Sequence, residues 1–124
     1  MRPIVLLFIA CALSACASSG ARPSRSSDVI TAEEIERASV SNAYDAVARL
    51  RPAFLRGRGQ SSIQNPGSDL PIVYVNGLRT GTIDNLRNIP AQDVQQIRFI
   101  SATDATTRYG TGHTGGIIEV TTRV

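Results

Sequence analysis

The distribution of apolar and polar residues predicts two short amphipathic helices in the first half of the chain. Thr31 and Glu34 have the spacing of a capping box, so the first helix is expected to begin there. Asn42 is a suitable N-cap for the second helix, which Pro52 ends. Apolar residues at helical spacing are expected to face the core from both helices: Ile35, Ala38, Ala43, Val47 and Leu50.

Strands are predicted on both sides of a polar loop in the middle of the chain. Residues 53–59 are expected to form a short strand that runs into a glycine turn, and residues 60–70 a loop. Residues 71–75 (PIVYV) are the strongest predicted strand because they are rich in β-branched and aromatic residues. Asn76-Gly77 favours a type I′ hairpin turn, so residues 78–83, distorted at Gly81, are expected to return beside it.

A helix followed by a short strand is expected next. Residues 89–97 resemble a helix with Pro90 at its first position, where the missing N–H is not needed. Val94 and Ile97 would face the core from that helix. Residues 98–100 (RFI) then have the composition of a short strand.

The end of the chain predicts one more helical turn and a closing strand. Ser101 and Asp104 have capping spacing and start a turn of helix that runs through Thr107. Residues 110–116 lead into residues 117–122 (IIEVTT), which have strand composition. The expected fold class is therefore α+β, with a small mixed sheet flanked by short helices.

An export signal is expected at the N-terminus. Residues 1–3 form a short positive segment, and residues 4–12 form an apolar run that suits a signal-peptide core but is too short to span a bilayer. Residues 13–16 (LSAC) resemble the bacterial lipobox, which implies cleavage before Cys16 and attachment of acyl chains such as palmitate to it. The alternative is an ordinary secretory leader that is cut at an A-x-A-like site nearby.

The lipobox interpretation divides the chain into a signal peptide at 1–15, the lipidated Cys16 with a serine-rich flexible tether at 16–30, and one domain at 31–124. Two or more acyl chains hold a protein stably on a membrane. Ala17, in place of Asp, implies sorting to the outer membrane, on its periplasmic or its surface face. Because Cys11 would leave with the leader, no disulfide and no cysteine metal site is expected.

Charge alone does not indicate a nucleic-acid partner. The formal net charge is +3, all 13 basic residues are Arg, and Arg49, Arg51, Arg56 and Arg58 lie close together in the sequence. Acidic residues are interspersed elsewhere, however, and no aromatic residues alternate with the arginines. We therefore expect an arginine surface that faces solvent or lipid headgroups, and no nucleic acid.

Gly110-x-Gly112-x-x-Gly115 has the glycine spacing of a phosphate-binding loop. A dinucleotide-binding loop follows a strand and opens a helix, whereas these glycines follow a predicted helix and open a predicted strand. The chain also has no Lys for a P-loop. No nucleotide and no other cofactor is expected, and the glycines are expected to allow positive φ and close approach between chain segments.

Five segments, in the right order, resemble the plug domain of TonB-dependent outer-membrane receptors. Residues 108–123 (RYGTGHTGGIIEVTTR) are similar to the closing segment of the plug, with its Arg-Tyr-Gly turn and final strand. The other similar segments are the opening at 29–35, the helix at 45–52, the strand and turn at 71–77, and the run from 89–97 through 104–110. Together they cover most of residues 29–123.

The resemblance implies a plug-like fold and an envelope partner. In receptors a barrel follows the plug, whereas this sequence ends one residue after Arg123, so the chain is not expected to transport anything by itself. Residues 27–30 (SDVI) are only a weak match to a TonB box, so coupling to TonB stays open. Siderophore binding stays open as well, because receptors also use barrel loops for it. The expected partner is an outer-membrane barrel or a TonB-system component, contacted through loops 57–69 and 108–116 and the hairpin turn. The candidate contact residues are Arg58, Asn65, Asn76, Gly77, Tyr109, Gly110, Gly112, His113 and Gly115.

Catalysis is not expected. His113 is the only His, and a triad would need it to act on Ser61 or Ser62, but a His among glycines and threonines is expected to be exposed and idle. Single aspartates at loops and helix starts are explained by capping, and no carboxylates are spaced for a metal: Asp69, Asp84, Asp93 and Asp104. Two alternatives remain, a lipoprotein that binds a small molecule or metal chelate, and a degenerate fragment of a receptor gene.

Overall fold

The computed structural model of the chain describes residues 27–56 and 69–123. Cys16, the signal peptide, most of the tether, and the loop that holds Arg58, Asn65, Ser61 and Ser62 lie outside these ranges.

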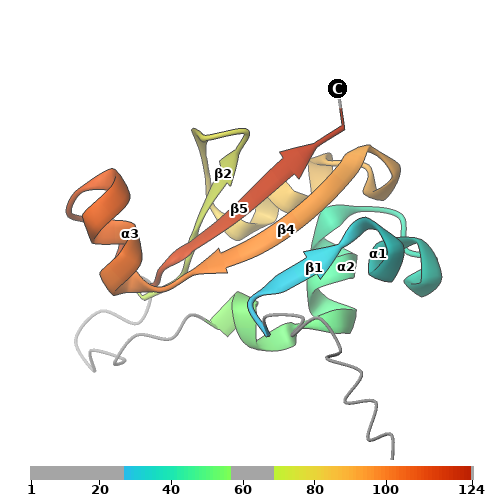
Figure 1. The fold of residues 1–124 in the computed structure, drawn as a ribbon, viewed down its shortest axis with the longest axis horizontal. Coiled ribbons are helices and arrows are strands. Elements are labelled where there is room, and N and C mark those ends of the chain that lie inside the picture. Colours follow the sequence, from blue (N-terminus) through green and yellow to red (C-terminus); the bar gives the residue numbers. More distant parts are fainter. Residues whose placement is uncertain (1–26, 57–68, 124) are drawn as a thin grey trace, which may run out of the picture.

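Five strands form one mixed sheet, in the order β1-β4-β5-β2-β3 (Figure 1). β2 and β5 are parallel, and every other neighbouring pair is antiparallel. β4 and β5 form the long centre of the sheet, while β1 and β3 are its edges. The expected small mixed sheet of an α+β fold is confirmed. The strands are β1 (Val29–Thr31), β2 (Ile72–Val75), β3 (Leu78–Gly81), β4 (Val94–Ile100) and β5 (Ile117–Thr122).

Three α-helices flank the sheet, and each begins with the cap that the sequence predicts. Thr31 accepts a hydrogen bond from the Glu34 N–H at α1 (Ala32–Ala38), where the full capping box is present. Asn42 caps α2 (Ala43–Leu50), and Ser101 caps α3 (Ala102–Tyr109). Each side-chain oxygen accepts from an N–H of the first turn, which has no partner within the helix.

The two faces of the sheet carry separate apolar clusters. The larger one lies between the sheet and α1 and α2, and its fully buried residues include Ile30, Val47, Val73, Ile97 and Val120. The smaller cluster lies under α3 and consists of Tyr74, Ile100, Ala105 and Ile117. Because alternate residues of a strand point to opposite faces, both clusters draw on β2, β4 and β5. None of the helices in the described part of the chain is long and apolar enough to cross a membrane.

The strand expected at residues 53–59 is wrong for the residues that the structure describes. Residues Pro52–Arg56 form a 3₁₀ helix, η1, that continues from the end of α2. Phe54 is 1% exposed and stacks on Phe99 of β4, with 5.2 Å between ring centroids. This packing against the sheet overrides the local strand preference.

The helix expected at residues 89–97 is also wrong. Only Ala91–Asp93 form one 3₁₀ turn, η3, and the chain then becomes β4. Val94 and Ile97 are nevertheless buried, as predicted. A register irregularity between Val94 and Gln96 places one extra residue in the strand, so positions three apart share a face. Two buried residues three positions apart fit a helix and a bulged strand equally well, and for this reason the sequence pattern indicated a helix.

The returning strand at 78–83 is shorter than expected. β3 ends at Gly81, and Ile83–Asn88 form a third 3₁₀ helix, η2, whose Leu86 is fully buried. The hairpin itself is confirmed, since Asn76 and Gly77 have φ values of 50° and 82°, both positive as a type I′ turn requires. Gly81, with φ of 131°, marks the predicted distortion.

The fold begins before the domain boundary predicted at residue 31. Val29 and Ile30, assigned to the tether, belong to β1, and Ile30 is fully buried. A strand of three residues is too short to show a period of two, and β1 pairs with residues of β4 that lie far along the chain.

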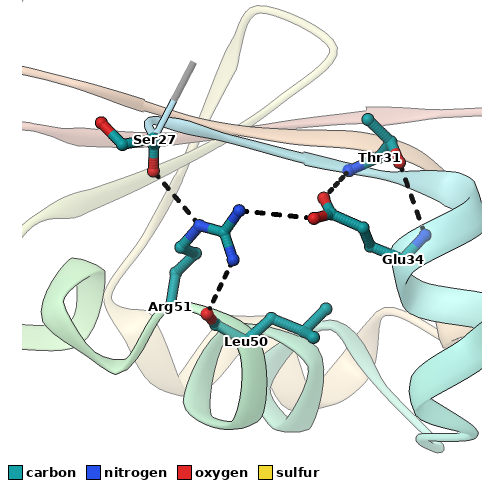
Figure 2. A network of polar contacts seen from close by, with 5 residues as sticks. All are labelled: Ser27, Thr31, Glu34, Leu50 and Arg51. Carbon is teal, nitrogen blue, oxygen red and sulfur yellow. Dashed lines mark hydrogen bonds and ion pairs between the residues drawn. The ribbon is translucent and has the colours of Figure 1, made fainter. Parts of the chain in front are cut away.

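Arg51 connects the start of this strand to the helices (Figure 2). Its Nε donates to the Ser27 carbonyl at 3.3 Å, and one terminal nitrogen donates to the Leu50 carbonyl at 2.9 Å. The other lies 3.3 Å from the Glu34 carboxylate, which also accepts from the Thr31 N–H. One guanidinium therefore ties the entry of the chain to α1 and to the end of α2. The sequence predicted that these arginines form an exposed surface. Arg49 and Arg56 are exposed, whereas Arg51 is partly buried and binds other parts of the fold.

Candidate functional site

The segment between α3 and β5 owes its path to glycine. Gly110, Gly112 and Gly116 have φ values of 86°, 98° and 83°, which L side chains rarely adopt. At Gly115 a Cβ would overlap the Asp69 carbonyl oxygen, and at Gly116 it would lie 2.6 Å from the Ile100 carbonyl oxygen. Positive φ and close approach of two chain segments were the predicted roles of these glycines, and both are confirmed.

His113 lies in the middle of this segment and is buried, with 5% of its surface exposed. The expectation of an exposed His is wrong. Its Nδ1 is 2.9 Å from the Gly110 carbonyl oxygen, and its Nε2 is 2.9 Å from the Tyr74 hydroxyl. Because a carbonyl only accepts, Nδ1 carries the proton, and in the neutral ring Nε2 accepts from Tyr74. The glycines fold the segment back so that the imidazole reaches the sheet.

Tyr109, the last residue of α3, completes the cluster from the other side. Its ring lies 4.7 Å from that of Tyr74 and 6.2 Å from the His113 ring, and its hydroxyl donates to Glu119 at 3.1 Å. Burial raises the pKa of Tyr109, and the hydrogen bond to Glu119 and the negative charge of that carboxylate raise it further. Sequence reasoning missed Tyr74 and Glu119. In each of the two predicted strands, however, alternate residues point to opposite faces of the sheet, and this places Tyr74 and Glu119 on the same face.

The contacts of this cluster stabilise the fold, because they join α3 and the closing segment to β2 and β5. Its members are Tyr74, Tyr109, His113 and Glu119. The hydroxyls of both tyrosines and Nε2 of His113 form hydrogen bonds within the cluster, and Nδ1 of His113 bonds the Gly110 carbonyl oxygen. The two serines proposed as nucleophiles lie outside the described residues. Within the described ranges, no group of three or more His, Cys, Asp or Glu side chains is placed to hold a metal ion.

The predicted contact residues separate into exposed and internal positions. Asn76, Gly77, Gly110 and Gly112 are exposed, Tyr109 is half-buried, and His113 and Gly115 are buried. Asn76 also joins the hairpin to β5, because its side chain donates to the Thr122 hydroxyl at 2.8 Å and accepts from the Thr122 N–H at 3.0 Å. Arg58 and Asn65 lie outside the described residues.

A polar part of the sheet extends beside α3. Arg98 pairs with Glu119 and Gln96 pairs with Thr121 across β4 and β5, on the face opposite the larger apolar cluster, and all four are partly exposed. We call Gln96, Arg98, Glu119 and Thr121 the polar sheet face. Sequence reasoning did not find it because residues 89–97 were assigned to a helix, which hides the period of two.

Comparisons with known proteins agree with this fold. Residues 21–117 match the family model of the TonB-dependent Receptor Plug Domain. A TonB-dependent receptor, P26, from Formosa agariphila is 33% identical over 71 residues, a segment that covers 57% of this chain and 7% of the relative. The chain thus spans a small part of that relative's length. No solved structure matches the chain.

The family is one of receptor domains of the cell envelope rather than of enzymes. Its model spans far more than half of this sequence, and both the glycine-rich closing segment and the mixed sheet lie within or next to the matched range. The chain therefore belongs to the family of TonB-dependent receptor plug domains.

Proposed function

We propose that this chain is a lipoprotein of the outer membrane whose plug-like domain binds or scaffolds another envelope protein. A barrel protein or a component of the TonB system is the partner that fits the family best. The observation that carries the proposal is the polar sheet face, which the domain leaves partly exposed beside α3.

The chemistry of that face suits a barrel interior. Gln96, Arg98, Glu119 and Thr121 are all polar. In the described ranges the exposed large apolar residues are Leu70 and Leu78, at 43% and 74% exposure. The interior of a transmembrane barrel is polar, so a polar, hydrogen-bonding surface can dock there without burying unpaired groups in lipid.

The exposed turns extend this docking surface. Asn76 and Gly77 stand at the end of the sheet next to Thr122, and Gly110 and Gly112 are exposed beyond α3. We assign partner contact to these four residues. His113 and Tyr109 support the surface from within, because both contact Tyr74 of β2. Gly115 lets the closing segment approach the backbone of Asp69 and Leu70, just before β2.

The anchor is supported by the lipobox-like residues 13–16. A diacylated and N-acylated Cys16 would carry enough buried CH₂ groups for stable membrane attachment. The experiment is mass spectrometry of the protein purified from a bacterial host, together with membrane fractionation of Cys16→Ala. We expect the mass of a lipidated chain that starts at residue 16, and release of the variant from the membrane. An unmodified residue 16 would rule out the anchor.

Docking is tested by site-specific photocrosslinking in the native host. A photoreactive residue is placed at Gln96 or Thr121 on the polar sheet face, and, as a matched control, at the exposed Arg49 on α2, which packs on the opposite face. We expect a discrete crosslinked band, identified by mass spectrometry as an envelope protein, from the first two positions. Equal labelling from Arg49, or no band from the polar face, would contradict docking through it.

A further inference from the structure

A cavity of about 510 Å³ lies between the start of β1, the end of β4 and α3. Its walls are Asp28 and Val29 from the first segment, Arg98 to Ile100 from β4, and Asp104, Thr107 and Arg108 from α3. None of the residues assigned above to docking, apart from Arg98, lines it. The cavity thus forms a place distinct from the exposed turns.

Arg98 enters the cavity from the middle of β4. It pairs with Val29 on one side and with Glu119 on the other, and it points to the α3 side of the sheet because its neighbours Ile97 and Phe99 belong to the larger cluster. Its Nε is buried and has no hydrogen-bond partner among the described residues. Buried donors without a partner are rare in folded proteins.

The carboxylates near Arg98 are engaged elsewhere. Glu119 accepts from the Tyr109 hydroxyl, Asp104 accepts from the Ser101 hydroxyl and helps to cap α3, and Asp28 accepts from the Ser27 hydroxyl. No ion pair joins any of them to Arg98 in the described structure. Arg108 brings a second guanidinium to the same cavity from the last turn of α3.

We propose that this cavity is a binding site for a carboxylate group, held by Arg98 with the help of Arg108. A guanidinium presents its donors in a planar fork that matches a carboxylate, and Arg98 and Arg108 bring two guanidinium groups to the wall of this cavity. The carboxylate can belong to a small free acid or to an acidic side chain of a protein. The inference goes beyond the proposed docking role and does not require it.

The test is a titration of the full ¹⁵N-labelled chain, purified in detergent, followed by the NMR signals of the arginine Nε–H groups. The probes are succinate, with neutral succinamide as its control, and a capped Gly-Gly-Glu-Gly-Gly peptide, with its Gln analogue as control. We expect the Arg98 signal to shift saturably with a charged probe and not with its neutral control. The apparent affinity should fall with added salt, because charged groups are screened.

Variants separate binding from folding. Arg98→Gln, followed through the Nε–H signal of Arg108, is expected to lower the affinity at least tenfold. Arg108→Gln, followed through the signal of Arg98, should lower it several-fold, while Arg79→Gln, on the far edge strand β3, leaves it unchanged. Since Arg98 carries a buried donor without a partner, Arg98→Gln should unfold at the same temperature as the unsubstituted chain or higher.

The two probes also distinguish the source. Binding of succinate assigns the site to a small acid, whereas binding of the peptide alone assigns it to a protein side chain. Either result supports the proposal if Arg98→Gln lowers the affinity at least tenfold. Absence of a saturable shift with both probes, or undiminished binding by Arg98→Gln, would overturn it. None of these readouts depends on membrane anchoring or on a crosslinked partner.

Discussion

His113 is held by hydrogen bonds at both ring nitrogens, and this double contact joins the closing segment to β2. Tyr74, which supplies one of these hydrogen bonds, is itself buried, with 7% of its surface exposed. Removing the imidazole would leave the buried Tyr74 hydroxyl without its partner. The sequence identified His113 as the only His but could not show its surroundings, because its partner is 39 positions away.

We expect His113→Ala to lower the free energy of unfolding by about 2–3 kcal/mol, because it leaves the buried Tyr74 hydroxyl without its partner and opens a cavity. Urea denaturation measures this. The exposed Arg79→Ala is the control and should change stability by about 0.5 kcal/mol or less. Combined with Tyr74→Phe, the loss should be smaller than the sum of the two single losses. Strict additivity would show that the two side chains do not interact.

The raised pKa of Tyr109 predicts that the stability of the fold decreases at alkaline pH. Its pKa is raised above the ordinary value of 10.0 in the folded protein, through burial and Glu119. Above the unfolded pKa the folded state therefore holds the proton more tightly than the unfolded state does. The stabilisation is complete below that value and is lost as pH rises through the folded pKa.

The measurement is a tyrosinate absorbance titration together with unfolding at a series of alkaline pH values. We expect Tyr109→Phe to remove one tyrosinate transition and to flatten part of the alkaline decline in stability. Glu119→Gln should lower the pKa of Tyr109, since it removes the negative charge that opposes ionisation. An alkaline decline in stability that is unchanged in Tyr109→Phe would show that Tyr109 is not its source.

At the scale of elements, α3, the glycine segment and β5 act as one unit. The helix ends at Tyr109, the chain reverses through positive φ angles, and β5 enters the centre of the sheet between β4 and β2. The position of this unit depends on close contact of Gly115 with the backbone at Asp69 and of Gly116 with Ile100. The sequence predicted the order of these elements and the reason for the glycines. It could not tell which glycine meets a neighbouring segment and which faces open space.

This difference predicts a graded series of glycine substitutions. Gly115→Ala and Gly116→Ala should each destabilise the protein by about 3 kcal/mol or more, because a Cβ would overlap backbone atoms that cannot easily move. Gly112→Ala, which has φ of 98° but nothing within 4 Å of its Cβ, should cost only about 1–2 kcal/mol. Thermal unfolding of the three variants gives the order. A larger loss at Gly112 than at Gly115 would contradict the contact argument.

At the scale of the whole molecule, the first strand belongs to the fold although the sequence placed it in the tether. β1 pairs with β4 along the edge of the sheet, and Arg51 binds the Ser27 carbonyl where the described chain begins. The fold thus controls where the preceding chain leaves the domain. For an anchored protein, this exit point would decide which surface faces the membrane.

A chain that begins at Ser27 is therefore expected to keep its fold, while one that begins at Thr31 should be much less stable. The shorter chain lacks Ile30, whose side chain is fully buried, and removal of such a side chain costs about 2–5 kcal/mol. Circular dichroism with urea denaturation compares the two. Ile30→Ala in the full chain is the matched control and should account for most of the difference, and equal stability of both fragments would return β1 to the tether.

The sequence by itself determined the features that depend on residues close together in the chain. These are the helix caps at Thr31, Asn42 and Ser101, the Asn76-Gly77 hairpin turn, the strand at 117–122 and the plug-family resemblance. Each rests on local hydrogen bonds, backbone sterics or a recognisable order of segments.

Only the tertiary structure decided which local preference prevailed and which distant residues met. Residues 94–97 satisfy a helical spacing, yet pairing with β1 and β5 on both sides makes them a bulged strand. Phe54 lies in a 3₁₀ turn because its ring stacks on that of Phe99 in β4. His113 is buried because it forms a hydrogen bond with Tyr74 of β2. Backbone pairing and burial over long sequence separations supply these free energies, and no short stretch of sequence contains them.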